Sequence, residues 1–211
     1  MATAPRVAVV DYGSGNLRSV EKALQQAGAT ILRCPAPEGL DTCDAIVLPG
    51  VGSFGDCARS LRRRGFLEPL RAWLDAGRPY LGICLGYQIL FESSEESPGD
   101  PGLGFWRGEV LRFPHKPGLK VPHMGWNTLQ QRAADPLFRG LPEPAFVYFV
   151  HSFFPVPADP AIITSTCRHG TEFAASARTG MVRGLQFHPE KSQTTGLQML
   201  GNFVDELRAA S

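Results

Sequence analysis

The residue pattern best suited to chemistry is a cysteine between two glycines, Gly82-Ile83-Cys84-Leu85-Gly86. Flanking glycines relieve crowding at a sharp turn between a strand and a helix, and the start of a helix favours a thiolate over a thiol. The pattern indicates a nucleophilic Cys84, with the backbone N–H of Leu85 as a donor to an oxyanion. A buried, unreactive cysteine whose glycines serve only packing explains this segment equally well.

A nucleophilic cysteine needs a base, and the base needs a group that orients it. The segment Gln186-Phe187-His188-Pro189-Glu190 supplies both at the end of a predicted strand. Pro189 favours extended backbone at His188, and residues two apart in an extended segment point the same way. We therefore expect Glu190 to lie beside His188 and hold its ring. Two other histidines remain as competing bases, His123 and His151.

A second glycine-rich segment, Pro49-Gly50-Val51-Gly52-Ser53-Phe54-Gly55, also follows an apolar run. It lacks the Gly-Lys-Ser/Thr ending of a Walker loop and the full G-x-G-x-x-G fingerprint. Because glycine lets a backbone approach an anion closely, we expect Gly50, Val51 and Gly52 to present N–H groups to an oxyanion. A plain turn is the alternative.

The first half of the chain alternates strands with helices, which indicates a parallel sheet covered on both faces. The strands are expected over residues 6–10, 45–48 and 80–84, and the helices over 17–27, 56–76 with a break near Gly65, and 85–91.

The second half has short strands and few helices, which indicates an antiparallel or mixed extension of the sheet. Strands are expected over 109–113, 146–150, 162–166, 173–177 and 182–187, loops over 92–104, 114–122, 142–144 and 155–160, and a final amphipathic helix from Leu197 to Leu207. The fold class predicted is α/β, an open mixed sheet, largely parallel, with helices on both faces, in one domain over residues 1–211.

Composition narrows the classes of function. A net charge of +1 gives no basic field for nucleic acid. The five cysteines are odd in number and none are spaced C-x-x-C, so neither a disulfide framework nor a zinc or other metal site is expected. No apolar run reaches membrane-spanning length. Reduced thiols and the absence of a signal region favour a cytoplasmic location.

Together these segments resemble the class I (triad) glutamine amidotransferases, a family that carries a G-x-C-x-G turn and a late H-P-E. The resemblance extends from about Val7 to Leu207. Four segments narrow it to the branch that serves histidine biosynthesis: D-Y-G-S-G-N-L at 11–17, P-G-V-G at 49–52, P-H-M-G-W-N at 122–127 and Y-F-V-H-S at 148–152. The resemblance implies hydrolysis of glutamine without a cofactor, and a heterodimer with a (β/α)8 cyclase subunit that receives the ammonia through its barrel.

The resemblance also implies residue roles. Gln88 and Glu96 would contact the substrate glutamine, with Glu96 facing its ammonium group. The backbone at His151 and Ser152 would hold its carboxylate.

The face that carries the active site would contact the cyclase. Asn16, Met124 and Trp126 match segments that face the partner in this family, and Tyr148 would line the ammonia exit. Exposed Trp and Met residues near an active site are plausible interface anchors. For Met124, burial in the chain's own core is an equally good interpretation.

Two other classes of function fit parts of the pattern. A cysteine peptidase or hydrolase on a related sheet would share the glycine-flanked cysteine but usually lacks a late H-P-E. A binding or regulatory module with a degenerate triad would not be expected to keep Cys84, His188 and Glu190 together.

Overall fold

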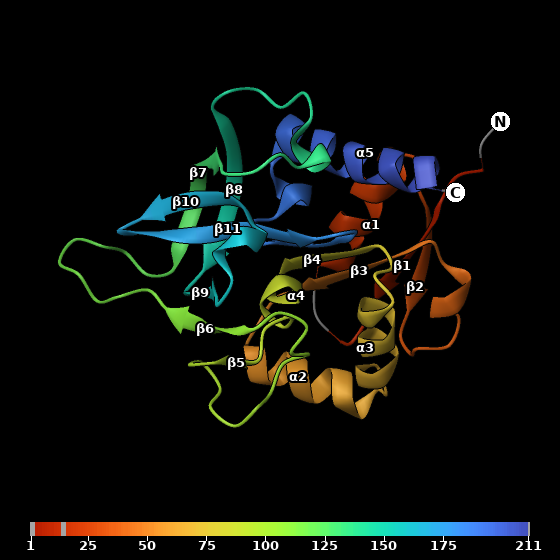
Figure 1. The fold of residues 1–211 in the computed structure, drawn as a ribbon, viewed down its shortest axis with the longest axis horizontal. Coiled ribbons are helices and arrows are strands. Elements are labelled where there is room, and N and C mark those ends of the chain that lie inside the picture. Colours follow the sequence, from red (N-terminus) through yellow and green to blue (C-terminus); the bar gives the residue numbers. More distant parts are fainter. Residues whose placement is uncertain (1–2, 14–15, 211) are drawn as a thin grey trace.

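The structure is a computed structural model that describes residues 3–13 and 16–210. Its main sheet contains β1 (Arg6–Val10), β2 (Thr30–Cys34), β3 (Ala45–Gly50), β4 (Tyr80–Cys84), β7 (His123–Gln131), β8 (Ala145–His151), β10 (Ile163–His169), β11 (Thr171–Thr179) and β12 (Val182–Leu185). These nine strands follow the order β2-β1-β3-β4-β12-β11-β10-β7-β8 (Figure 1).

The sheet changes direction at β12. From β2 to β12 every neighbouring pair is parallel, and β11, β10, β7 and β8 continue the sheet with antiparallel pairs. The predicted fold class, a largely parallel sheet with an antiparallel extension, is confirmed. The second-half strands join the main sheet because β12 pairs directly with β4.

Helices cover both faces of the parallel half, as Figure 1 shows. α1 (Leu17–Gln26) and the long α5 (Gln193–Ala210) lie on one face, and α2 (Phe54–Arg63) and α3 (Leu67–Asp75) lie on the other. The short helix α4 (Leu85–Gln88) follows β4 directly. Single 3-10 turns complete the list: η1 (Leu40–Thr42), η2 (Pro136–Phe138), η3 (Pro160–Ile162) and η4 (Pro189–Lys191).

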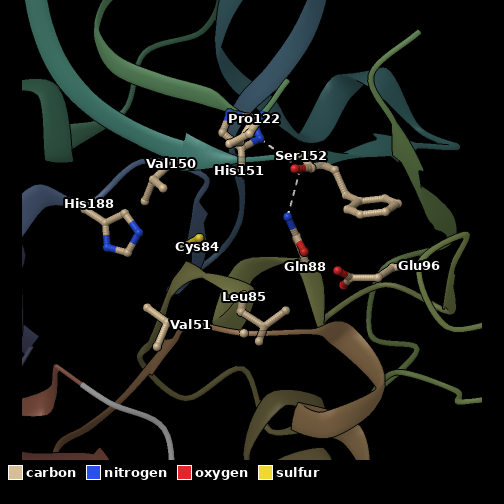
Figure 2. A pocket seen from close by; sticks show the side chains of 12 residues that line it. Val51, Cys84, Leu85, Gln88, Glu96, Pro122, Val150, His151, Ser152 and His188 are labelled. Carbon is tan, nitrogen blue, oxygen red and sulfur yellow. Dashed lines mark hydrogen bonds between the residues drawn. The ribbon is translucent and has the colours of Figure 1, made fainter. Parts of the chain in front are cut away.

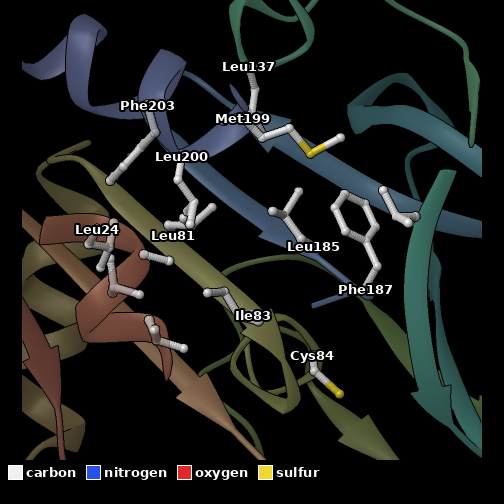
Figure 3. Close-up of a cluster of buried hydrophobic side chains, with 14 of the residues drawn as sticks. Leu24, Leu81, Ile83, Cys84, Leu137, Leu185, Phe187, Met199, Leu200 and Phe203 are labelled. Carbon is white, nitrogen blue, oxygen red and sulfur yellow. The ribbon is translucent and has the colours of Figure 1, made fainter. Parts of the chain in front are cut away.

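Two apolar clusters hold these layers on the sheet. On the face of α5, the side chains of Leu200 and Phe203 pack with Leu81, Ile83 and Leu185 from the central strands (Figure 3). All five are at most 1% exposed. Alternate residues of the same strands point to the opposite face, where they pack against α2 and α3. Both faces of the central strands are therefore buried, which explains why their sequences are unbroken apolar runs.

A second sheet of three strands lies beside the main one. It contains β5 (Ser93–Ser94), β6 (Gly108–Arg112) and β9 (Phe153–Pro157), in the order β5-β6-β9. The prediction of a loop over 155–160 is wrong for residues 155–157, because they belong to β9. Proline is tolerated there since β9 is an edge strand with one unpaired side. Four strands, β2, β5, β7 and β9, were not predicted, and β5 lies within the loop expected over 92–104. The helix expected over 85–91 ends at Gln88.

Strand register brings the candidate residues together. In the parallel pairs, Gly50 of β3 is opposite Cys84 of β4, and Leu185 of β12 is opposite Ile83. Since parallel strands end at the same edge of the sheet, the segments after β3, β4 and β12 meet at one place. These are the glycine loop, the cysteine turn and the segment that leads to His188.

Candidate active site

Cys84 occupies a strained turn between β4 and α4. Its φ of 54° and ψ of −104° lie in a region that residues with a side chain rarely adopt. The flanking glycines are required by contact: a Cβ on Gly86 would lie 1.7 Å from the carbonyl oxygen of Leu48, and one on Gly82 would lie 2.2 Å from that of Gly86. The predicted reason for the G-x-C-x-G pattern is therefore visible in the structure, and strain of this kind is characteristic of functional sites.

A cavity of about 270 Å³ opens beside the cysteine. Figure 2 shows Cys84 near its centre, with His188 on one side and Gln88 and Glu96 on the other. The lining is Val51, Gly52, Cys84, Leu85, Gln88, Glu96, Pro122, Val150, His151, Ser152, Phe153 and His188. Most of the residues predicted for catalysis and for glutamine binding thus share one hollow of a size suited to a small ligand.

His188 and Glu190 form the expected pair. The Nδ1 atom of His188 lies 2.8 Å from Oε1 of Glu190, and both side chains are at most 2% exposed. Pro189 starts the 3-10 turn η4 and His188 is extended, with φ of −102° and ψ of 96°. The Nε2 atom of His188 is buried and finds no hydrogen-bond partner among the described residues. A ring held at Nδ1 with Nε2 open is the arrangement that a general base needs.

The charges around His188 favour its protonated form. Burial lowers the pKa of His188, but its interactions with Cys84 and its hydrogen bond and charge interaction with Glu190 outweigh burial and raise the pKa above its ordinary value of 6.5. An imidazolium beside a cysteine stabilises a thiolate, which is the nucleophilic form.

The two competing bases are excluded by their contacts. Nδ1 of His151 lies 2.8 Å from the carbonyl oxygen of Phe153, and its Nε2 lies 3.1 Å from Nδ1 of His123. Both ring nitrogens of His151 are therefore engaged, and His123 does not line the cavity. Burial lowers the pKa of His151 to about 3 and that of His123 to about 4. Neither histidine is placed to accept a proton from the thiol of Cys84.

A polar contact to the thiol comes from Gln186, to which the sequence analysis gave no role. Its side chain is fully buried, and its Nε2 donates to Sγ of Cys84 at 3.7 Å. Its Oε1 accepts from Nε2 of Gln88 at 3.0 Å. One signal pointed to it: Gln186 is two residues before His188 in an extended segment, so both side chains leave the backbone on the same side.

The predicted glutamine-binding side chains line the cavity in fixed orientations. Nε2 of Gln88 donates to the carbonyl oxygen of Phe153 at 2.9 Å. Oε2 of Glu96 accepts from the backbone N–H of Phe54 at 2.7 Å, at the start of α2. Glu96 is half-buried. The backbone at Ser152 also borders the cavity.

The glycine loop approaches the thiol from the end of β3. Val51 and Gly52 line the cavity, and Gly50 is buried just behind it. Gly52 has a φ of 106°, a conformation that favours glycine. A Cβ on Gly50 would meet the Tyr12 hydroxyl at 2.5 Å and Cβ of Leu85 at 2.7 Å. Glycine is therefore needed at Gly50 for close approach to the turn that carries Cys84.

An apolar face lies next to the cavity on the outer hairpin of β7 and β8. Met124 is 63% exposed and Trp126 is 46% exposed, so the interpretation of Met124 as a core residue is wrong. Trp126 pairs across the hairpin with Tyr148, their rings edge to face at 6.0 Å. Phe146, two residues before Tyr148, is 48% exposed and extends this face. Exposed apolar patches of this kind mark interaction sites.

Asn16 contacts the triad at Glu190. Its Nδ2 donates to Oε1 of Glu190 at 3.4 Å, a long hydrogen bond. Ser14 and Gly15, which belong to the same predicted motif, lie outside the described residues.

Within residues 3–13 and 16–210, no group of three or more His, Cys, Asp or Glu side chains is arranged to hold a metal ion. No helix in that part of the chain is both long and apolar enough to cross a membrane.

The chain was then compared with known proteins. The family model of class-I glutamine amidotransferases matches residues 8–207. The subunit HisH of imidazole glycerol phosphate synthase from Synechococcus sp. (strain JA-3-3Ab) is 49% identical over 205 residues, which cover 96% of this chain and 94% of that protein. The same subunit from Acaryochloris marina is 48% identical over 208 residues, 97% of this chain and 96% of the relative.

Solved structures share the fold. PurLQS from Thermotoga maritima superposes with a TM-score of 0.76 at 24% identity, over 97% of this chain and 99% of that one. A putative GMP synthase subunit from Thermoplasma acidophilum superposes with a TM-score of 0.70 at 21% identity, over 98% of this chain and 95% of that one. These structures show the fold alone. The family model and the relatives establish that the chain is an enzyme that belongs to the class-I glutamine amidotransferases, within the family of the HisH subunit.

Proposed function

We propose that this chain is the glutaminase subunit of an imidazole glycerol phosphate synthase, with residues 1–211 acting as one glutamine amidotransferase domain. The observation that carries the site assignment is geometric. Cys84 and His188 face one cavity, and His188 is held by Glu190 at 2.8 Å. The relatives that are nearly half identical carry the name of this synthase, and they match this chain over nearly their whole length.

The reaction begins at the thiol. The Cys84 thiolate attacks the side-chain amide carbon of glutamine, and backbone N–H groups of Leu85 and of residues 50–52 stabilise the tetrahedral oxyanion. His188, charged and held by Glu190, gives its proton to the amide nitrogen, so that the C–N bond breaks and ammonia leaves. A γ-glutamyl thioester on Cys84 remains.

Water completes the cycle. Neutral His188 takes a proton from a water molecule as that water attacks the thioester carbonyl, and the C–S bond breaks to release glutamate and Cys84. Gln88 and Glu96 hold the amino-acid end of the substrate, with Glu96 facing its ammonium group. The backbone at His151 and Ser152 holds the carboxylate.

The ammonia serves a partner. A (β/α)8 cyclase subunit would dock on the apolar face formed by Met124, Trp126 and Tyr148, with Asn16 at its margin. Tyr148 links this face to the triad: its carbonyl oxygen accepts from the backbone N–H of His188 at 2.9 Å. A partner that moves β8 would therefore move His188.

The cyclase uses the ammonia to convert a phosphoribulosylformimino-aminoimidazole carboxamide ribotide into imidazole glycerol phosphate and the aminoimidazole carboxamide ribotide. We place this histidine-biosynthesis step in the cytoplasm.

The test is glutamate release from glutamine by this chain alone, with the cyclase subunit, and with the cyclase and its nucleotide ligand. We expect weak activity alone and a large increase with the loaded partner. Cys84→Ala should abolish glutamate release without preventing complex formation. Wild-type rates from Cys84→Ala, or full activity of the isolated chain, would contradict the proposal.

A further inference from the structure

At the cavity wall, His151 forms a buried pair with His123, which lies outside the lining. His123 and His151 lie opposite each other on β7 and β8, and they are 4% and 6% exposed. Nδ1 of His123 lies 3.1 Å from Nε2 of His151. Neither histidine serves as the base, so their burial and direct contact call for another explanation.

The partners at both ends of the pair determine where its protons are. At one end, the carbonyl oxygen of Phe153 can only accept, so Nδ1 of His151 must carry a proton. At the other end, Oδ1 of Asn127 accepts from the backbone N–H of Thr128 at 2.8 Å, and Nδ2 of Asn127 donates to the carbonyl oxygen of Arg168 at 3.0 Å. The Asn127 amide is thereby oriented with its Nδ2 towards His123.

Only one distribution of protons satisfies every contact. Nδ2 of Asn127 lies 3.2 Å from Nε2 of His123, which must accept. Nδ1 of His123 therefore carries the proton and donates to Nε2 of His151. A second proton on either ring would set two donors against each other. The lowered pKa values of both histidines, caused mainly by burial, agree with two neutral rings.

The rings are also fixed by packing. His123 stacks on Phe149 with ring centroids 4.6 Å apart and on His169 with centroids 4.1 Å apart. Phe113 meets both His123 and His151. These contacts leave His123 little freedom to turn, so the direction of its hydrogen bond is set before any substrate arrives.

The pair acts on the cavity through one carbonyl group. The oxygen of Phe153 accepts from His151 and also from Nε2 of Gln88, at 2.8 and 2.9 Å (Figure 2). The other contact of Nε2 of Gln88 is Oε1 of Gln186 at 3.0 Å. Nε2 of Gln88 thus donates to both acceptors, the Phe153 carbonyl oxygen and Oε1 of Gln186, and Oε1 of Gln88 is left to accept from a ligand. Because Oε1 of Gln186 faces Gln88, Nε2 of Gln186 faces Cys84.

We propose that His123 and His151, both neutral and both protonated on Nδ1, are positioning residues that hold the Phe153 carbonyl and, through it, orient Gln88 for glutamine. The inference deepens the proposed function and rests on it for the identity of the ligand. It predicts a larger effect on KM for glutamine than on kcat, because the pair holds the Phe153 carbonyl that orients Gln88 and reaches Cys84 only indirectly, through Gln186.

Substitutions at His123 separate this role from bulk packing. Asn places its Nδ2 where Nδ1 of histidine lies and can still donate to His151, whereas Phe keeps the ring and cannot. In the cyclase complex, we expect His123→Phe to raise KM for glutamine about tenfold, as for a lost buried hydrogen bond. Its kcat should stay within about threefold, and His123→Asn should restore KM to within about threefold of wild type. His169→Phe, which alters the same aromatic cluster outside the hydrogen-bond chain, is the matched control and should change neither constant.

An NMR measurement tests the protons without any assay of activity. Long-range ¹H–¹⁵N spectra of histidine-labelled chain at pH 7 should show both residues as neutral Nδ1–H tautomers. An Nε2–H tautomer in either ring, a KM unchanged in His123→Phe, or an Asn variant as defective as Phe would overturn the inference. If His123→Phe does not fold, His151→Asn and His151→Leu provide the same comparison at Phe153. Failure of the proposed function would appear differently, as wild-type complex that releases no glutamate.

Discussion

The side-chain amide of Gln186 donates to the thiol of Cys84 across the junction of β12 and β4, with 3.7 Å between Nε2 and Sγ. The contact exists because the two strands are parallel neighbours, so residues just beyond their ends meet at the same edge of the sheet. The orientation of the amide is not free, since Gln88 occupies its oxygen. Gln186 therefore presents a donor to the sulfur, which favours the thiolate.

Replacing Gln186 with methionine tests this contact. Methionine has similar length and no donor, so Gln186→Met should lower kcat/KM for glutamine by about 10- to 100-fold, as expected for loss of a hydrogen bond to a charged group. Alkylation of Cys84 by iodoacetamide near neutral pH should slow in parallel. Equal alkylation rates in the variant and wild type would show that the amide does not stabilise the thiolate.

The two partners of Glu190 should differ greatly in importance. Its bond to His188 is short and buried, whereas its bond to Asn16 is 3.4 Å long and exposed. Glu190→Gln keeps the shape but removes the charge, and should lower kcat by about 10²- to 10⁴-fold, by analogy with the Asp-to-Asn change in a serine-protease triad. Asn16→Ala should change glutamate release by less than about threefold when the cyclase is saturating, because long exposed hydrogen bonds contribute little. A larger loss in Asn16→Ala than in Glu190→Gln would contradict this ranking.

The buried histidines predict a loss of stability in mild acid. Burial lowers the pKa of His151 to about 3 and that of His123 to about 4, against an ordinary value of 6.5. The folded chain then binds fewer protons than the unfolded chain, so their contribution is full above pH 6.5 and is lost as pH falls towards 4. Each histidine contributes a slope of about 1 kcal/mol per pH unit between pH 6 and 5.

His151→Asn isolates one of these slopes. Urea unfolding at pH 7, 6 and 5 should show a free energy of unfolding that falls less steeply in the variant than in wild type, by about 1 kcal/mol per pH unit. The variant's stability at pH 7 is a separate quantity and does not enter the comparison. Parallel curves for the two proteins would mean that His151 is not held neutral by burial.

Two glycines should respond to alanine in opposite ways. A Cβ on Gly86 would lie 1.7 Å from the Leu48 carbonyl oxygen, so Gly86→Ala requires the cysteine turn to move and should cost at least about 3 kcal/mol of stability. At Gly201, within α5, an added Cβ would meet no heavy atom within 4 Å. Gly201→Ala should stabilise the chain by about 0.5–1 kcal/mol, because alanine restricts the unfolded chain and favours helix. Thermal unfolding of both variants measures the two changes in stability, and a Gly86→Ala chain more stable than Gly201→Ala would contradict the prediction.

The sequence predicted the catalytic residues better than the residues that position them. Cys84, His188 and Glu190 stood out because each is part of a local pattern: a glycine-flanked turn, or an extended segment before and after a proline. The strands 6–10 and 80–84 were also predicted with the observed bounds, since buried parallel strands show as unbroken apolar runs.

The roles of Gln186 and the His123–His151 pair could not be predicted in the same way. Each depends on which strands are neighbours: Gln186 reaches Cys84 through the pairing of β12 with β4, and the histidines meet through the register of β7 with β8. Strand β7 itself was missed because its outward side chains, Met124 and Trp126, are apolar and exposed, so the alternation that identifies a half-buried strand is absent.

The other cysteines provide an internal control for the central claim. Burial raises the pKa of Cys34 to about 11 and those of Cys57 and Cys167 to about 12, and it also raises the pKa of Cys43. These four thiols are therefore protonated at neutral pH and should not react. Cys84 differs from them in facing a cavity beside His188.

The most direct test is therefore a covalent one. The complex with the cyclase and its nucleotide ligand is treated with 6-diazo-5-oxo-norleucine, a glutamine-like electrophile, and the modified residue is located by peptide mass spectrometry. We predict one adduct per chain, on Cys84, formed in step with the loss of glutamate release and prevented by excess glutamine. Modification of a different residue, or glutamate release that persists after Cys84 is fully modified, would contradict the assignment of Cys84 as the nucleophile.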